Sequence, residues 1–250
     1  MTQKIIQSQV YNTKNQTKQT GLDVVIALYP GVTQLDFTGP HQVFMRAPES
    51  TVRVAAMESA LELDGLHFAN LVSLRDIPSC DLLCIPGGFG AADAIHNPAF
   101  MAEIKRLAST ANTLCSVCTG SLIFAAAGLL RGRKATCHWS WLEYLAQFPE
   151  VDVVGDRVVQ DTNNQQTLLT GGGVTAGIDM ALTAVGELFG QATAERIQLI
   201  LEYNPRPPFN AGHPSTASAD TVSALKTVLA PYMEGPREKI LAFLENEVSA

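Results

Sequence analysis

Short, apolar runs rich in β-branched residues alternate along the chain with segments whose apolar residues recur at helical spacing. The strand-like runs lie at 23–29, 51–57, 80–85 and 113–117, with further candidates for strands or hairpin arms at 151–155, 157–161 and 166–170. The helix-like segments lie at 34–47, 98–110, 119–130, 140–148, 174–190 and 192–203. Strands that alternate with helices form a parallel sheet covered on both faces. The pattern therefore predicts an α/β fold with a mostly parallel central sheet.

The chain shows no internal repeat and no obvious linker, so we expect one domain over residues 22–218. The preceding segment 1–21 is polar, rich in Gln, Thr and Asn, and lacks the apolar core of a signal peptide. We expect this leader to be disordered. The C-terminal extension 219–250 should be helical, broken at Pro231 and at Gly235–Pro236, and packed on the core or on a partner.

Composition excludes several classes of partner. The net charge is −7 with no long basic run, which argues against nucleic acid. The apolar run 121–130 is far shorter than the ~20 residues of a membrane span. Charged residues make up 16% of the chain, against roughly 25% in a typical protein, so part of the surface should be covered by a partner subunit. Five cysteines without export indicate free thiols in the reducing cytoplasm.

Cys118 lies where the strand-like run 113–117 meets the helix-like segment 119–130. Ligands of open α/β sheets bind at such junctions. Ser116 and Gly120 flank the cysteine, and their small side chains permit the sharp strand-to-helix turn that also presents nucleophilic serines. The turn would expose the sulfur beside free N–H groups of the helix, which lowers a thiol pKa. These features favour a nucleophilic cysteine over a buried structural one.

Other roles for the cysteines have less support. Cys115 precedes Cys118 by three positions inside a strand, so the two side chains would point to opposite faces and not form a redox pair. A zinc site would need a second pair at ligand spacing, which the sequence lacks. We expect four cysteines to be small buried hydrophobic residues: Cys80, Cys84, Cys115 and Cys137.

Asp36 is the candidate proton donor because it follows the first strand and has the apolar neighbours Leu35 and Phe37. If it faces Cys118, the two acids would titrate as a coupled pair in which one group holds the proton. A raised pKa would then make Asp36 a general acid. The plain alternative is an aspartate at a helix N-terminus. Thr119 either hydrogen-bonds Asp36 or caps the following helix.

Three further features are candidates for the walls of the site. Gly87 and Gly88 follow a strand end, where their N–H groups can face a bound anion or simply form a turn. His138 is the nearest candidate for a general base, so a Cys–His dyad stays open. The proline-rich segment 202–214 is a loop that either rims the pocket, grips a second subunit or does neither.

The segment TGGGVTAGID contains Gly171, Gly173 and Ala176 at the spacing of a dinucleotide-binding fingerprint. It comes late in the chain, however, and Asp179 in the following helix would repel a pyrophosphate. We therefore favour a tight glycine turn behind the active site, with Gly173 in contact with substrate.

Several segments together resemble the ThiJ/PfpI superfamily: CIPGGFG, SVCTGSLIFAAAGLLRGRKATCHW and GGGVTAGIDMAL. Within that superfamily, GVTQLDFTGP and EYNPRPPFNAGHP are similar to segments of isonitrile hydratases. The resemblance covers about residues 23–218. It implies a flavodoxin-like fold, a homodimer, and hydration of isonitriles to N-substituted formamides without a metal or cofactor.

The same resemblance implies roles for single residues. Cys118 would be the nucleophile that forms a thioimidate, and Asp36 would deliver a proton and then activate water. Thr119 would support Asp36, and Gly88 would be a backbone donor. Two positions separate the chain from other branches: many superfamily members carry glutamate at the position of Asp36, and Thr119 stands where peptidase-type members carry histidine.

Two other functions remain open on the sequence. One is a ligand-sensing domain like that of AraC-type regulators, which need roughly a hundred further residues for DNA binding, whereas this chain ends about thirty residues after the domain. The other is a glutathione-independent glyoxalase or a peptidase-like hydrolase. We expect the hydratase, with a small-molecule isonitrile as its partner.

Overall fold

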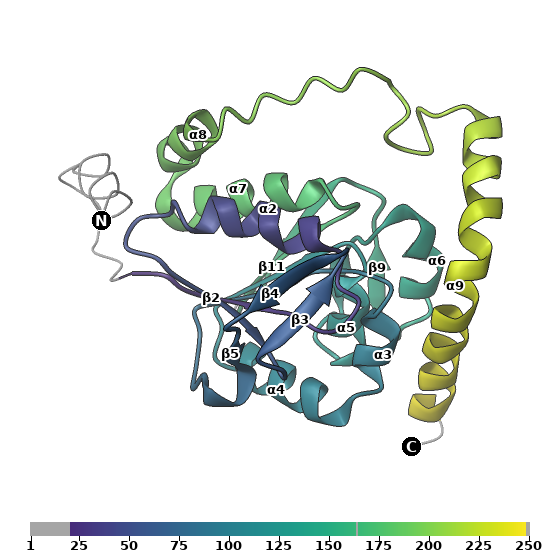
Figure 1. Cartoon of the computed structure of the whole chain (residues 1–250), viewed down its shortest axis with the longest axis horizontal. Helices are drawn as coiled ribbons and strands as arrows, with labels where there is room; N and C mark the ends of the chain where they lie inside the picture. The colour runs from purple at the N-terminus through teal and green to yellow at the C-terminus, as the bar shows by residue number, and fades with distance from the viewer. Residues whose placement is uncertain (1–20, 164, 249–250) are drawn as a thin grey trace.

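A twisted seven-stranded sheet forms the centre of the molecule (Figure 1). The computed structural model describes residues 21–163 and 165–248, so the predicted leader lies, except for Gly21, outside the described residues. The strand order is β10 (Val158–Thr162), β11 (Thr167–Gly171), β7 (Thr113–Val117), β6 (Leu82–Ile85), β1 (Asp23–Ala27), β2 (Thr51–Ala56) and β5 (Val72–Ser73). All neighbouring strands are parallel except the hairpin β10–β11.

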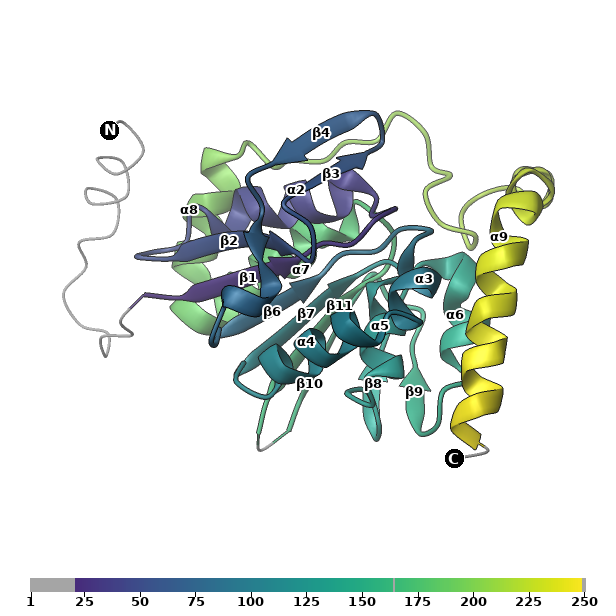
Figure 2. The ribbon, with the colours of Figure 1, turned by 60° about the horizontal axis from the view of Figure 1, so that its bottom comes forward.

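Helices cover both faces of this sheet (Figure 2). On one face lie α2 (Gln34–Phe44) and α7 (Ala176–Phe189), with α8 (Gln191–Ile200) packed on α7. On the other face lie α3 (Ala91–Ile95), α4 (Pro98–Ala108) and α5 (Gly120–Ala126). The predicted α/β architecture with a mostly parallel sheet is confirmed. Every residue of β6 and β7 is buried, as strands covered on both faces require.

The register of the central strands brings three strand ends together. Ile26 of β1 lies beside Cys84 of β6, and Cys84 lies beside Cys115 of β7. The three strands therefore end at the same edge of the sheet, and the loops that follow them meet there. This edge is where ligands of open α/β sheets bind.

Two small sheets lie outside the central one. The hairpin of β3 (Ala60–Leu63) and β4 (Leu66–Ala69) was not predicted, although its Asp64-Gly65 turn is a strong hairpin signal. Asp64 Oδ2 accepts the N–H of Gln34 at 2.8 Å and so caps the start of α2. The other pair is β8 (Arg133–Ala135) with β9 (Val151–Val153), and β9 covers the first three residues of the run that we expected at 151–155. Between them lie the 3₁₀ turn η2 (Trp139–Trp141) and α6 (Leu142–Leu145), and a second 3₁₀ turn, η1 (Leu74–Asp76), follows β5.

The C-terminal extension forms one long helix, α9 (Ala219–Val248), which follows an irregular loop (Figure 1). Our expectation of a break was wrong, because both Pro231 and Pro236 lie inside the helix. Met233 and Ile240 are buried against the core, and this packing offsets the backbone hydrogen bonds that the prolines remove. The expected packing of the tail on the core is thus confirmed. Among the described helices, none has both the length and the apolar character needed to cross a membrane.

Candidate active site

Cys118 occupies a strained turn between β7 and α5. Its φ angle is 56°, in the left-handed region that residues other than glycine seldom adopt. The N–H of Cys118 donates to the carbonyl of Gly171 at 2.9 Å, which ties the turn to the end of β11. A Cβ atom at Gly120 would lie 2.2 Å from the carbonyl oxygen of Ile85, so only glycine allows α5 to start this close to β6. The predicted sharp turn is confirmed.

Asp36 reaches the same point from the first turn of α2. Its side chain is 0% exposed, and Oδ2 accepts the N–H of Gly87 at 3.0 Å. A Cβ atom at Gly87 would lie 2.7 Å from Cys118 Cβ and 2.8 Å from Asp36 Oδ2. The missing side chain of Gly87 therefore lets the carboxyl group and the cysteine approach each other. The other oxygen, Oδ1, is buried and has no hydrogen-bond partner within the described part of the chain.

Burial controls the protonation of this pair. Desolvation raises the pKa of Asp36 to about 7, although the bonds from Gly87 and Cys118 act in the opposite direction. Burial, reinforced by the charge of Asp36, also raises the pKa of the Cys118 thiol well above its ordinary value. Our expectation of a lowered cysteine pKa is therefore wrong, because desolvation outweighs the helix N-terminus. The pair holds at least one proton at neutral pH.

Thr119 and the glycine turn after β6 bond to each other. The Thr119 hydroxyl accepts the N–H of Gly88 at 2.8 Å and donates to the Gly88 carbonyl at 2.9 Å. Thr119 stands at the N-cap position of α5, but its hydroxyl makes no capping hydrogen bond and does not bond Asp36. The N–H group of Gly87 donates to Asp36 and that of Gly88 donates to Thr119. Neither N–H group is therefore free to bind an anion, which was one of the two roles that we considered for these glycines. These bonds instead fix the acid and the nucleophile to one turn.

Tyr29 supports the same turn and was not identified from the sequence. Its buried hydroxyl donates to the carbonyl of Pro86 at 2.8 Å. Burial, with the nearby charges of Asp36 and Cys118, raises the pKa of Tyr29 well above its ordinary value, so it stays a neutral donor. Tyr29 follows β1 by two residues and directly precedes Pro30-Gly31, and this position after a strand could have indicated it.

A cavity of about 280 Å³ opens above Cys118. Its polar lining residues are Thr33, Gly88, Cys118, Thr119, His138 and Ser140. Its apolar lining residues are Phe89, Trp141 and Val174 from the domain, with Leu225, Leu229 and Met233 from α9. The sequence did not indicate the α9 residues, because they lie more than a hundred positions from Cys118. The cavity suits a small molecule with an apolar substituent.

His138 forms part of this wall, and its bonds are with Ser140. Nδ1 accepts the Ser140 N–H at 3.3 Å and lies 2.8 Å from the Ser140 hydroxyl. Burial lowers the pKa of His138, so the ring is neutral at pH 7 with its proton on Nε2. The structure thus places His138 at the site as a wall residue and does not join it to Cys118 as a dyad.

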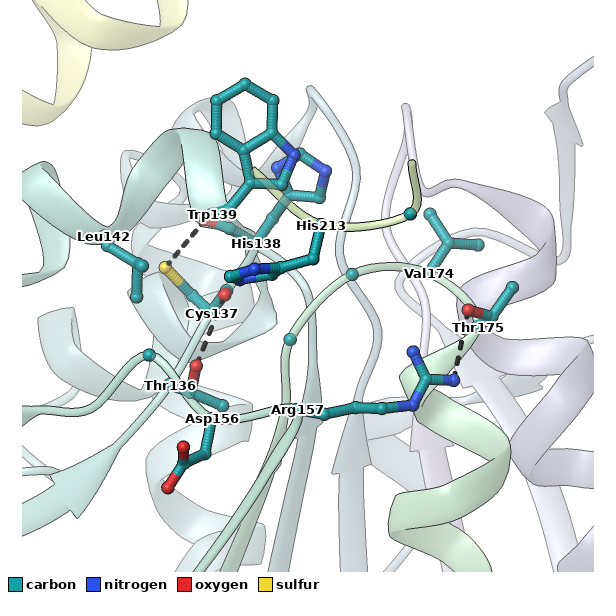
Figure 3. Close-up of a pocket in the computed structure, with 14 residues that line it drawn as sticks. Thr136, Cys137, His138, Trp139, Leu142, Asp156, Arg157, Val174, Thr175 and His213 are labelled. Atoms are coloured by element: carbon teal, nitrogen blue, oxygen red, sulfur yellow. Dashed lines mark hydrogen bonds between the residues drawn. The ribbon is translucent and has the colours of Figure 1, made fainter. Parts of the chain in front are cut away.

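A second cavity of about 430 Å³ adjoins the first and shares His138 and Val174 with it (Figure 3). Gly173, which we predicted to contact substrate, lines this second cavity and not the one above Cys118. The loop 202–214 reaches the second cavity through Gly212 and His213. That loop therefore rims the neighbouring cavity, and none of its residues lines the cavity above Cys118.

All five cysteines are free and buried. Burial was expected for four of them but not for Cys118, whose sulfur we expected the turn to expose. Across residues 21–163 and 165–248, no cluster of three or more His, Cys, Asp or Glu side chains is placed to bind a metal ion.

Comparison with known proteins gives the family of the chain. The model of the DJ-1/PfpI family matches residues 23–187. An isonitrile hydratase from Pseudomonas putida is 40% identical over 215 residues, which cover 85% of this chain and 92% of that protein. The HTH-type transcriptional regulator CdhR from Pseudomonas aeruginosa is 30% identical over 55% of this chain and 40% of its own length.

Solved structures show the same fold. A ThiJ/PfpI family protein from Pseudomonas syringae superposes with a TM-score of 0.82 at 33% identity, covering 95% of this chain and 99% of that one. Drosophila melanogaster DJ-1beta superposes with a TM-score of 0.64 at 22% identity, covering 73% of this chain and 98% of that one.

Proposed function

Since the chain belongs to the DJ-1/PfpI family, we propose that it uses the family fold to hydrate isonitriles, R–N≡C, to N-substituted formamides. The observation that carries this proposal is the buried pair of Cys118 and Asp36 beneath an apolar cavity. The 40% identity to an isonitrile hydratase gives the substrate class. An isonitrile is small and uncharged, so a largely apolar cavity with one nucleophile and one acid suits it.

The first half of the reaction joins the substrate to the enzyme. Asp36 accepts the proton of Cys118 as the sulfur attacks the terminal carbon and a C–S bond forms. Asp36 then passes this proton to the same carbon, which gives the thioimidate R–N=CH–S–Cys. The unpartnered Oδ1 of Asp36 is the oxygen that remains free to carry the proton.

Water completes the reaction. The Asp36 carboxylate accepts a proton from water as its oxygen adds to the thioimidate carbon, and the substrate nitrogen takes up that proton. The adduct R–NH–CH(OH)–S–Cys then breaks its C–S bond, and the hydroxyl proton returns to sulfur. The balance is R–NC + H₂O → R–NH–CHO, with the enzyme unchanged and no metal or cofactor in the scheme.

We test the proposal by incubating purified protein with cyclohexyl isonitrile and measuring N-cyclohexylformamide by gas chromatography. Steady formation of the formamide over many turnovers supports it. A protein that leaves the isonitrile intact but converts methylglyoxal without glutathione would instead be a glyoxalase.

The rate should depend on pH through Asp36. In the reactive form, Cys118 is a thiol and Asp36 is a carboxylate, so the two groups share one proton. Below pH 7 the Asp36 carboxylate is itself protonated and cannot accept the proton of the thiol. We expect kcat/KM to rise with an apparent pKa of about 7 and then level off. Well below this pKa it should fall about tenfold per pH unit. A profile that is flat from pH 5 to 8, in protein that stays folded, would contradict this role.

We also propose that the chain works as a homodimer. Leu199 and Phe209 are each 80% exposed and Tyr232 is 67% exposed, so these large side chains are available for contact with a second subunit. Light scattering should give about twice the chain mass of 26.8 kDa at micromolar concentration. A single species of the chain mass would contradict the proposal.

A further inference from the structure

The helix α9 supplies a wall of the cysteine cavity although it lies outside residues 23–187, which the family model matches. Leu225, Leu229 and Met233 line the cavity, and their spacing of four residues puts them on one face of the helix. We infer that these three side chains select the substituent R that the site accepts. The inference rests on the proposed function, since it names the part of the isonitrile that α9 contacts.

The C-terminal half of α9 is fixed to the domain. Met233 is 2% exposed and Ile240 is 1% exposed. Lys239 forms an ion pair with Asp93, and the ring of Phe243 meets that of His96 edge-on at 6.1 Å. These contacts hold the Met233 end of the wall against the domain.

The N-terminal half of α9 has a different environment. In residues 219–232 only Val222 and Leu229 are not exposed. An adjoining groove of about 480 Å³ lies between α9 and the segment η2–α6, and it shares Leu229 with the cavity above Cys118. Few side chains of this half pack in the core. Substitution at Leu225 or Leu229 should therefore change the shape of the cavity more than the stability of the fold.

The chemistry gives this wall a defined task. An isonitrile is linear, so its substituent extends away from the carbon that the sulfur attacks. Cys118 and Thr119 occupy the reacting end of the cavity, whereas α9 contributes only apolar side chains. An apolar wall contacts the apolar R group and distinguishes substituents by size. One methylene group more or less in such a pocket changes kcat/KM by about 10-fold to 200-fold.

The experiment compares a small substrate, isopropyl isonitrile, with a bulky one, 1-adamantyl isonitrile. Leu229→Ala should raise the bulky-to-small ratio of kcat/KM about tenfold, and Leu225→Trp should lower it. Val228→Ala is the matched control, because Val228 is the adjacent residue, is 62% exposed and does not line the cavity. Its ratio should equal that of the wild type.

A second readout does not depend on hydration. Methyl and benzyl methanethiosulfonate each convert the Cys118 thiolate to a mixed disulfide with release of methanesulfinate, which mass spectrometry of the Cys118 peptide follows. Leu229→Ala should raise the benzyl-to-methyl rate ratio, and Leu225→Trp should lower it. If the benzyl-to-methyl ratios of Cys118 modification shift but no isonitrile is consumed, α9 controls access to the Cys118 thiol and the proposed function fails. If neither variant shifts either ratio, the inference about α9 is overturned.

Discussion

Replacing Cys118 with alanine is expected to lower kcat for formamide formation by about 10⁴-fold or more. The reaction depends on a covalent bond from this sulfur to the substrate. Among the described residues, no other thiol lines the cavity above Cys118. The remaining acid and cavity can hold an isonitrile, but they supply no nucleophile stronger than water. Initial rates with cyclohexyl isonitrile, compared with wild type at equal concentration of folded protein, measure the effect.

Cys80→Ala is the matched control for this substitution. Cys80 is also a buried thiol, but it lies before β6 and its sulfur contacts the carbonyl of Leu107. Its replacement should leave kcat close to the wild-type value. Formamide production by Cys118→Ala at a tenth of the wild-type rate would show that the thiol does not form the intermediate. The covalent mechanism would then have to be abandoned.

Asp36→Asn is expected to make the protein more stable at alkaline pH while it removes activity. The folded state raises the pKa of Asp36 from 3.8 to about 7, so folding favours the protonated form. As the pH rises from 4 to 7, the wild type must bury a growing fraction of charge and loses stability. A difference of about three pKa units corresponds to about 4 kcal/mol. Asparagine stays neutral, so the variant avoids this loss.

The measurement is the free energy of unfolding in urea at several values of pH. The stability of Asp36→Asn relative to wild type should increase by about 4 kcal/mol between pH 3 and pH 8. Asp152→Asn is the control, because Asp152 is exposed on β9, and its relative stability should change little with pH. Parallel curves for Asp36→Asn and wild type would show that the carboxyl group is not held in a desolvated state.

The same variant should lose about 10²-fold to 10⁴-fold in kcat. Asparagine can still accept the N–H of Gly87, so the local backbone should persist, but its amide cannot shuttle a proton. If the variant is both more stable and inactive, the wild type gives up folding stability to keep in place a carboxyl group that the reaction needs. Full activity would place the proton carrier elsewhere.

The order of strands and helices could be predicted from the sequence, because it depends on local patterns. Runs such as 113–117 carry no polar alternation and so had to be buried on both faces. The turn at Cys118 could also be predicted, since Gly120 leaves room for it. Asp36 was identified by its apolar neighbours, which a solvated aspartate rarely has. The hairpin of β3 and β4 also has a local signal, the Asp-Gly pair at residues 64 and 65.

The tertiary structure decided the properties that depend on distant segments. The thiol pKa of Cys118 rises because several elements together exclude water from it, an effect that no local pattern reports. The hydroxyl of Thr119 bonds Gly88 because β6 and β7 end side by side. Leu229 meets the cavity because α9 packs back on the domain through Met233 and Ile240. Sequence determines which groups are present and how the local backbone turns, whereas desolvation and the far wall of a pocket arise only when separate segments pack together.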